Sequence, residues 1–323
     1  MWEFIKKRKG LVGGFGFSLL LSLMIPLAIA NMATASVEEA ATGVAKLNIW
    51  QGIVLGFVQG ATEFIPISST AHMKAIPVFF GWGDPGVAFT AVIQLGSIAA
   101  VLWYFWSDLT QITKGMFKAI STSNYDSQDF WLAVGIAIGT IPIVIFGLGI
   151  KLFVPDYDNS ILRSMPSIAI ASIVMGLLLG LAEYMGNQKR NFEDLTTKDG
   201  IVIGLAQALA IIPGVSRSGS TMTAGLFTNL DRATAARFSF LLGIPAITLA
   251  GLVELKDLIE AGIDSCQTIV IIVGLISSAI FSYLAIAWLI KFLQRRSTWV
   301  FVWYRIGFGI FILGMIALGW ISA

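Results

Sequence analysis

The chain has 323 residues, of which 56% are hydrophobic and 12% are charged, and its mean hydropathy is +0.83. This balance excludes a soluble globular domain and indicates an integral membrane protein. The formal net charge of +2 is dispersed and offers no basic patch for nucleic acid, and the single cysteine, Cys266, excludes an internal disulfide or a cysteine metal site.

Apolar runs long enough to cross a bilayer, which takes about 20 helical residues, predict an all-α fold with seven membrane spans. They lie near residues 11–30, 88–106, 130–153, 167–184, 233–253, 268–290 and 301–321. The first run follows four basic residues and ends in a small-residue pattern near Ala33 and Ala35. It predicts either a cleaved signal peptide or a membrane anchor, and the sequence leaves both open.

Two further segments, 47–80 and 199–230, are predicted to be re-entrant helical hairpins, each entering and leaving on the same face. With this assignment most lysines and arginines outside the apolar runs fall on the cytoplasmic side, as the positive-inside rule expects. Arg305 is counted on that side. The two hairpins also share a pattern, since Gly56, Gln59 and Ser68 match Gly204, Gln207 and Ser216 at one constant offset.

The matching hairpins predict two inverted repeats, each formed by one hairpin and three spans. The predicted divisions are a signal-like or anchor segment at 1–46, a first repeat at 47–184, a cytoplasmic loop at 185–198 and a second repeat at 199–323. In folds of this kind, broken helices from opposite faces meet near the membrane midplane and build the site there.

The first hairpin carries one carboxylate, one imidazole and a hydroxyl-rich turn. Gln59 and Glu63 lie four residues apart, on one helical face, and are predicted to bind Mg²⁺ or Ca²⁺ through oxygen atoms. The turn contains Ser68, Ser69 and Thr70. Ser69 is the predicted nucleophile, with His72 as its base, although a phosphohistidine intermediate on His72 stays open.

The second hairpin contains a short loop of small residues around Arg217. A guanidinium can bind two phosphate oxygens at once, and backbone amides at a helix start also favour an anion. Arg217 is therefore predicted to be catalytic, beside Glu63, Ser69 and His72. The predicted phosphate-binding residues are Ser68, Thr70, Gly214, Ser216, Arg217, Ser218 and Gly219.

These motifs resemble those of a known family. The first hairpin is similar to the (E/Q)xxxE motif followed by Phe-x-Pro-x-Ser-Ser-x-x-His, and Pro213 to Gly219 is similar to the PGxSRSG motif, of the undecaprenyl-diphosphate phosphatase family, also called bacitracin-resistance proteins. The resemblance covers roughly residues 47–321. Two positions depart from the family pattern, because Gln59 is the neutral option of its motif and Ala71 replaces a frequent glycine.

The resemblance implies an enzyme that hydrolyses undecaprenyl diphosphate to undecaprenyl phosphate and inorganic phosphate. It implies recycling of the lipid carrier for cell-wall synthesis, bacitracin resistance, a divalent cation, and a site in the bacterial inner membrane that opens to the outer face. The expected partners are the polyprenyl diphosphate and membrane lipids, without nucleic acid. The oligomeric state stays open, with a homodimer as one option.

A second hypothesis is a membrane transporter or flippase of a polyprenyl phosphate. Paired broken helices that meet at the midplane also build secondary transporters. A flippase needs the anion clamp of Arg217 but not the pair of Ser69 and His72. The presence of both favours the hydrolase.

Overall fold

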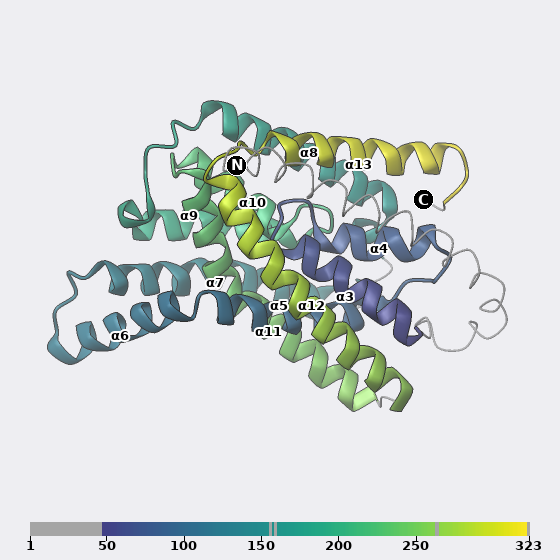
Figure 1. Ribbon diagram of the computed structural model, residues 1–323, viewed down its shortest axis with the longest axis horizontal. Coiled ribbons are helices and arrows are strands. Elements are labelled where there is room, and N and C mark those ends of the chain that lie inside the picture. The colour runs from purple at the N-terminus through teal and green to yellow at the C-terminus, as the bar shows by residue number, and fades with distance from the viewer. Residues whose placement is uncertain (1–46, 155–156, 158–159, 262–264, 322–323) are drawn as a thin grey trace, which may run out of the picture.

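The computed structural model describes residues 47–154, 157, 160–261 and 265–321, and this part of the chain is helical, with no strand (Figure 1). Six helices within it are long and apolar enough to cross a membrane. These spans are α5 (Gly86–Tyr104), α7 (Gln128–Phe153), α8 (Met165–Met185), α11 (Arg232–Ala261), α12 (Ser265–Leu293) and α13 (Trp299–Ala317). They confirm an all-α, multi-pass membrane protein, while the predicted span at 11–30 and the alternatives of signal and anchor lie outside the described residues.

Each of the two segments predicted to be a hairpin forms a pair of helices joined by a turn. The first consists of α3 (Ile49–Glu63) and α4 (Ser69–Phe79), and the second of α9 (Thr197–Ala208) and α10 (Arg217–Phe227). With 11 residues each, α4 and α10 are about 16 Å long, roughly half of the hydrocarbon core. Neither could cross the bilayer alone.

An additional helix, α6 (Trp106–Thr122), continues α5 after a break at Phe105. It pairs with the beginning of α7, where Gln111 Nε2 donates to Asp129 Oδ1 over 3.0 Å. Figure 1 shows this pair projecting from the body of the molecule at the left. No span was predicted between 106 and 130, because α6 is amphipathic and too polar to be recognised as one.

The loop at 185–198 is held to the second hairpin by an ion pair. Arg190 Nη1 and Nη2 donate to the two carboxylate oxygens of Asp199 over 2.8 and 2.6 Å. Burial raises the pKa of Asp199, but the hydrogen bonds from Arg190 and Thr196 outweigh it and hold the pKa below its usual value. This charge pair fixes the start of α9 and therefore the position of the second hairpin.

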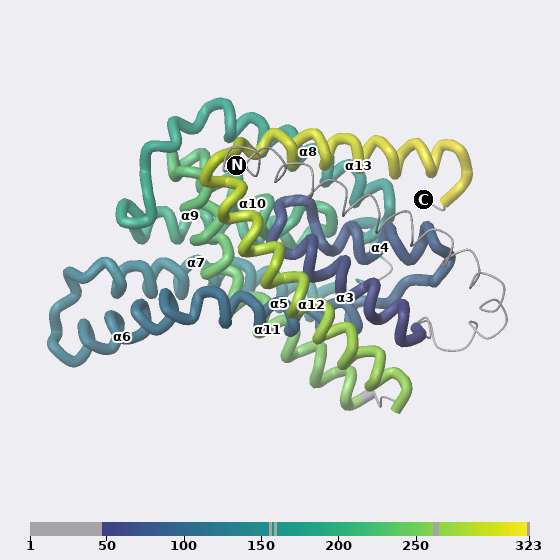
Figure 2. The backbone as a smooth tube through the Cα atoms, viewed as in Figure 1, coloured from purple at the N-terminus to yellow at the C-terminus, as the bar shows by residue number. Residues whose placement is uncertain are grey.

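Glycines let each hairpin approach a spanning helix closely. A Cβ on Gly56 of α3 would lie 2.3 Å from the carbonyl oxygen of Gly274 in α12, and one on Gly204 of α9 would lie 2.3 Å from the Cα of Gly139 in α7. Figure 2 shows α3 running beside α12. Such backbone contacts are typical of membrane helices, where small residues take the place of a hydrophobic driving force.

The two hairpins share a turn geometry at equivalent positions. Ser68 and Ser216 both have positive φ, of 75° and 72°, and each caps the following helix, α4 or α10, through its hydroxyl. Gly56 and Gly204, which make the close approaches, stand at the same spacing from these serines. The shared geometry is what a duplicated unit would give, while the inverted relation of the halves and the division bounds stay predictions.

The buried core lies directly behind the hairpin turns. Phe64, at the end of α3, packs edge-on against Phe240 of α11 with 5.0 Å between ring centroids. Arg305 of α13 is fully buried within this helix, so counting it among the basic residues of a cytoplasmic loop was wrong. In a sequence, a single arginine within an apolar span is most simply interpreted as marking a helix end. The partners that allow Arg305 to be buried are carbonyl groups of residues distant along the chain.

We expect Gly204→Ala to destabilise the fold, because the added methyl group meets the backbone of α7. Overpacking of this kind costs about 1–3 kcal/mol. Gly314→Ala in α13 is the matched control, since a Cβ there meets nothing within 4 Å and both variants gain the same helix propensity. Thermal unfolding of the detergent-solubilised protein, followed by tryptophan fluorescence, measures both. Equal melting temperatures would contradict the tight crossing.

Candidate active site

A cavity of about 670 Å³ lies between the two hairpins and helices α5, α7 and α11. Its inner end is polar and buried, with Glu63, Ser69, Ser216 and Arg217 on its lining. Its exposed end carries a charged pair, Lys151 and Asp257. The walls between the two ends are mostly aliphatic and include Val87, Ala91, Val144, Leu148, Ile212, Ala246, Ile247, Ala250 and Val253. The cavity is therefore shaped for a ligand with a polar head and an apolar tail.

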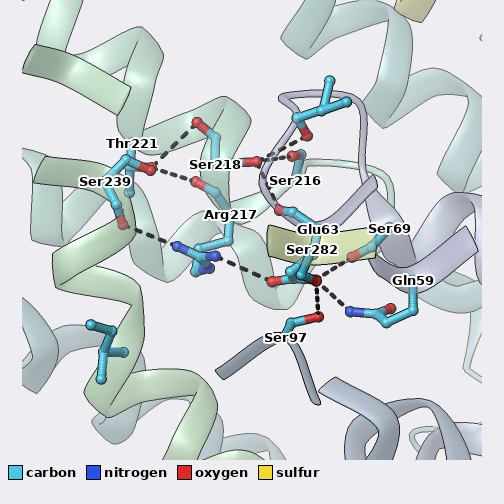
Figure 3. Close-up of polar contacts among 12 residues, drawn as sticks. Gln59, Glu63, Ser69, Ser97, Ser216, Arg217, Ser218, Thr221, Ser239 and Ser282 are labelled. Atoms are coloured by element: carbon cyan, nitrogen blue, oxygen red, sulfur yellow. Dashed lines mark hydrogen bonds and ion pairs between the residues drawn. The ribbon is translucent and has the colours of Figure 1, made fainter. Parts of the chain in front are cut away.

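Glu63 is the centre of the polar contacts at the inner end (Figure 3). Its Oε2 accepts hydrogen bonds from Gln59 Nε2 over 2.8 Å and from Ser69 Oγ over 2.7 Å. Its Oε1 accepts from Arg217 Nη2 over 3.2 Å. The predicted face of α3 is thus confirmed, and the structure brings residues of both hairpins onto one carboxylate.

Arg217 stands at the first turn of α10 and lines the cavity. Besides Glu63 it contacts α11, where Nη1 donates to the carbonyl oxygen of Ser239 over 3.0 Å. Its Nε has no partner among the described residues. Two of the five guanidinium N–H donors are therefore engaged by Glu63 and Ser239, and the side chain still lines the cavity that an anion would enter.

The amino-terminal ends of α4 and α10 both meet at the inner end. Ser68 Oγ accepts from the Ala71 amide over 3.3 Å, and Ser216 Oγ accepts from the Gly219 amide over 3.1 Å. Ser68, Thr70, Gly214 and Ser216, which were predicted to bind phosphate, line the cavity. Two helix amino termini beside an arginine give a positive environment that suits phosphate.

Ser218 and Gly219 do not line the cavity. Ser218 Oγ instead donates to the carbonyl oxygens of Glu63 and Ile65, over 3.2 and 3.1 Å, and so joins the two hairpins. The Gly219 amide is engaged by the cap of α10. In this structure the two residues support the site and do not face a ligand.

His72 is not paired with Ser69, contrary to the sequence-based expectation. Its Nδ1 lies 2.7 Å from the Ser68 carbonyl oxygen and its Nε2 lies 2.6 Å from the Tyr304 hydroxyl, while its ring stacks on Phe308. Because a carbonyl oxygen only accepts, Nδ1 carries a proton, and in a neutral ring Nε2 would then accept from the Tyr304 hydroxyl. The ring is buried and outside the cavity lining.

The difference has a physical reason. Spacing within α4 places Ser69 and His72 within reach of one another, but α13, 232 residues further along the chain, supplies the aromatic partners that hold the imidazole. The Ser69 hydroxyl donates to Glu63 instead. Sequence analysis also missed Tyr304 and Ser239, because neither stands in a hairpin motif.

The inner end offers oxygen ligands for one divalent cation. Within the described residues no group of three or more histidines, cysteines, aspartates or glutamates is placed to hold a metal. Glu63 is the only carboxylate at the inner end of the described cavity. Gln59 stands behind it and does not line the cavity; its Nε2 faces Glu63, and its Oε1 is buried without a partner among the described residues. With the Gln59 amide turned so that Oε1 faces Glu63, one carboxylate and one amide oxygen would fit a magnesium ion that takes its remaining ligands from substrate phosphate and water.

Comparison with known proteins places this site in a family. Residues 52–311 match the family described as bacitracin resistance protein BacA. An undecaprenyl-diphosphatase from Synechocystis sp. is 65% identical over 286 residues, which cover 87% of this chain and 88% of the relative. One of the same name from Nostoc sp. is 61% identical over 316 residues, 98% of each chain. The last alignment leaves few residues out and thus extends into the segment 1–46. The chain therefore belongs to the bacitracin resistance protein BacA family.

Proposed function

We propose that this chain hydrolyses undecaprenyl diphosphate to undecaprenyl phosphate and inorganic phosphate. The observation that carries the proposal is the Glu63 carboxylate, which accepts from Ser69 and Arg217 at the buried end of an apolar cavity. Relatives of 61% and 65% identity carry the name undecaprenyl-diphosphatase. The activity recycles the lipid carrier for cell-wall synthesis and underlies resistance to bacitracin.

The polar inner end and the aliphatic walls of the cavity suit different parts of the substrate. The diphosphate lies at the inner end, where Arg217 and the starts of α4 and α10 neutralise its charge. The beginning of the prenyl chain lies along the aliphatic walls, where each buried methylene contributes about 0.8 kcal/mol. The rest of the chain remains in the bilayer, which needs no further pocket in the protein.

Ser69 is the proposed nucleophile and Glu63 its proton acceptor, replacing the predicted base His72. Ser69 Oγ bonds to the terminal phosphorus, its proton passes to Glu63 Oε2, and the bond from that phosphorus to the bridging oxygen breaks with the electron pair leaving on undecaprenyl phosphate. After Glu63 releases that proton to solvent, it takes one from water, whose oxygen attacks the phosphorus of phosphoserine. The bond from phosphorus to Ser69 Oγ breaks, inorganic phosphate leaves, and Glu63 returns its proton to Oγ to restore the hydroxyl.

A divalent cation, Mg²⁺ or Ca²⁺, is proposed to bind with Glu63 and the Gln59 carbonyl oxygen. When bound, it neutralises charge that develops on the phosphoryl oxygens. Gln59 contributes a neutral ligand where the family motif also allows glutamate. The cation and the Arg217 guanidinium then share the Glu63 carboxylate.

The site is proposed to open to the outer face of the bacterial inner membrane. The cavity mouth carries Lys151 at the end of α7 and Asp257 near the end of α11. Basic residues such as Lys291 and Arg296 stand at the end of α12 and before α13, which is the opposite end of the bundle. The positive-inside rule puts that basic end in the cytoplasm.

The flippase alternative is not favoured. Transport of a polyprenyl phosphate would need the anion site but not a serine hydroxyl 2.7 Å from a buried carboxylate. That contact is what a hydrolase needs to activate a nucleophile.

Ser69→Ala, Glu63→Gln and Arg217→Ala are each expected to lower kcat for phosphate release from a long-chain prenyl diphosphate by about 10²–10⁴-fold, since each removes a group that acts on the reacting phosphoryl. Thr62→Val is the matched control, because Thr62 precedes Glu63 in α3 but its hydroxyl bonds only the Val58 carbonyl oxygen. A similar loss in the control would assign all four effects to disruption of the helix.

His72→Ala is expected to keep a covalent intermediate, whereas Ser69→Ala abolishes it. Rapid acid quenching with substrate labelled on the terminal phosphate measures this directly, because phosphoserine survives acid and phosphohistidine does not. Acid-labile label that disappears in His72→Ala would instead establish the phosphohistidine. Turnover without any label would assign the attack to water.

Chelation of divalent cations is expected to abolish phosphate release, and added Mg²⁺ or Ca²⁺ to restore it. Gln59→Glu is expected to lower the cation concentration for half-maximal activity several-fold, since a second carboxylate strengthens the site. Titration of each cation in both proteins measures the difference. Full activity in the presence of chelator would show that the reaction does not need a divalent cation.

A further inference from the structure

Arg305 is a buried cation without a carboxylate partner. Its side chain projects from α13 and is fully buried, and it forms no ion pair with the described part of the chain. An arginine at this depth of a membrane protein is expensive and usually has a function. The motifs of the two hairpins do not include it, and the hydrolysis outlined above does not use it.

The guanidinium is bound by four backbone carbonyl oxygens. Nε donates to Ser172 in α8 over 3.2 Å, which ties Arg305 to the pair of long helices α8 and α13. Nη1 donates to Pro66 over 3.0 Å, and Nη2 donates to Gly214 over 2.7 Å and to Val215 over 3.0 Å. One planar group thus connects the turns of both hairpins to the same rigid support.

The carbonyls of Pro66 and Gly214 stand at equivalent positions of the two turns, each two residues before a capping serine. Those serines, Ser68 and Ser216, are the residues with positive φ. Such a backbone conformation is strained for a residue other than glycine and persists only where the surroundings impose it. Arg305 supplies part of that constraint at both turns at once.

The positions of the two turns determine the positions of the side chains that act on the substrate. Ser69 and Arg217 directly follow the two capping serines, and both contact Glu63. A shift of one turn against the other would separate Ser69 from Arg217, and a displacement of about 1 Å at reacting groups can cost 10²-fold in rate.

We propose that Arg305 is a positioning residue for hydrolysis, which holds the two hairpin turns in register through their equivalent carbonyls. The inference rests on the proposed function. Its positive charge, balanced by no described carboxylate, also remains to favour the diphosphate at the inner end. Lysine in its place would keep the charge but lose the two Nη groups that donate to Pro66 and Gly214 at the same time.

The test compares kcat and KM for phosphate release in the full-length protein and in Arg305→Lys. We expect kcat to fall about 100-fold while KM changes by less than about threefold, since charge is kept and geometry is lost. Arg237→Lys is the control, because Arg237 pairs with Asp108 away from the cavity. Unchanged kcat in Arg305→Lys, or an equal loss in Arg237→Lys, would overturn the proposal.

A second pair of variants decides the matter where Arg305→Lys does not fold. A Cβ on Gly176 would lie 3.1 Å from Arg305 Cβ, whereas one on Gly180, a turn along the same helix, would lie 3.2 Å from Trp299 and Val302. We expect Gly176→Ala to lower kcat by at least about threefold and Gly180→Ala to leave it unchanged. Equal rates would overturn the proposal. Absence of phosphate release from the wild type would overturn the proposed function itself.

Discussion

The ion pair between Glu63 and Arg217 joins two hairpins that lie 154 residues apart in the chain, and the site depends on it. Both side chains are nearly buried, at 5% and 8% exposure. A buried ion pair has to offset the loss of hydration, and it does so only where geometry is good and further hydrogen bonds are made. Gln59, Ser69 and the Ser239 carbonyl provide them here.

That geometry is imposed from outside the pair. Each hairpin lies against a spanning helix at a glycine, Gly56 against α12 and Gly204 against α7, so the backbones are fixed by hard contact. The turns are then joined to each other, since Ser218 of the second hairpin donates to two carbonyls of the first. These backbone contacts determine where the side chains at the inner end lie. The same contacts bury the non-helical backbone of the turns in protein, which is the condition under which it is tolerated at membrane depth.

The sequence was most informative where one segment carries its own signal. Apolar length identified the six spans of the described residues, and the distribution of lysines and arginines indicated both hairpins. Contacts between distant segments were not visible. The i, i+3 spacing of Ser69 and His72 suggested a catalytic pair, but Tyr304 and Phe308 of α13 hold the imidazole elsewhere. Arg305 was misplaced for the same reason, because no local pattern reveals that its partners are carbonyls of two remote turns.

Charge balance connects these features to the chemistry. At the inner end and directly behind it stand one carboxylate, Glu63, and two guanidinium groups, Arg217 and Arg305, while the hydrogen bonds of His72 fit a neutral ring. The described protein groups thus sum to about one positive charge in a medium where an unbalanced charge is costly. A diphosphate ester carries two to three negative charges. It reverses the sign of the site. The divalent cation proposed above would bring the sum back close to zero, so substrate and cation would then favour each other's binding.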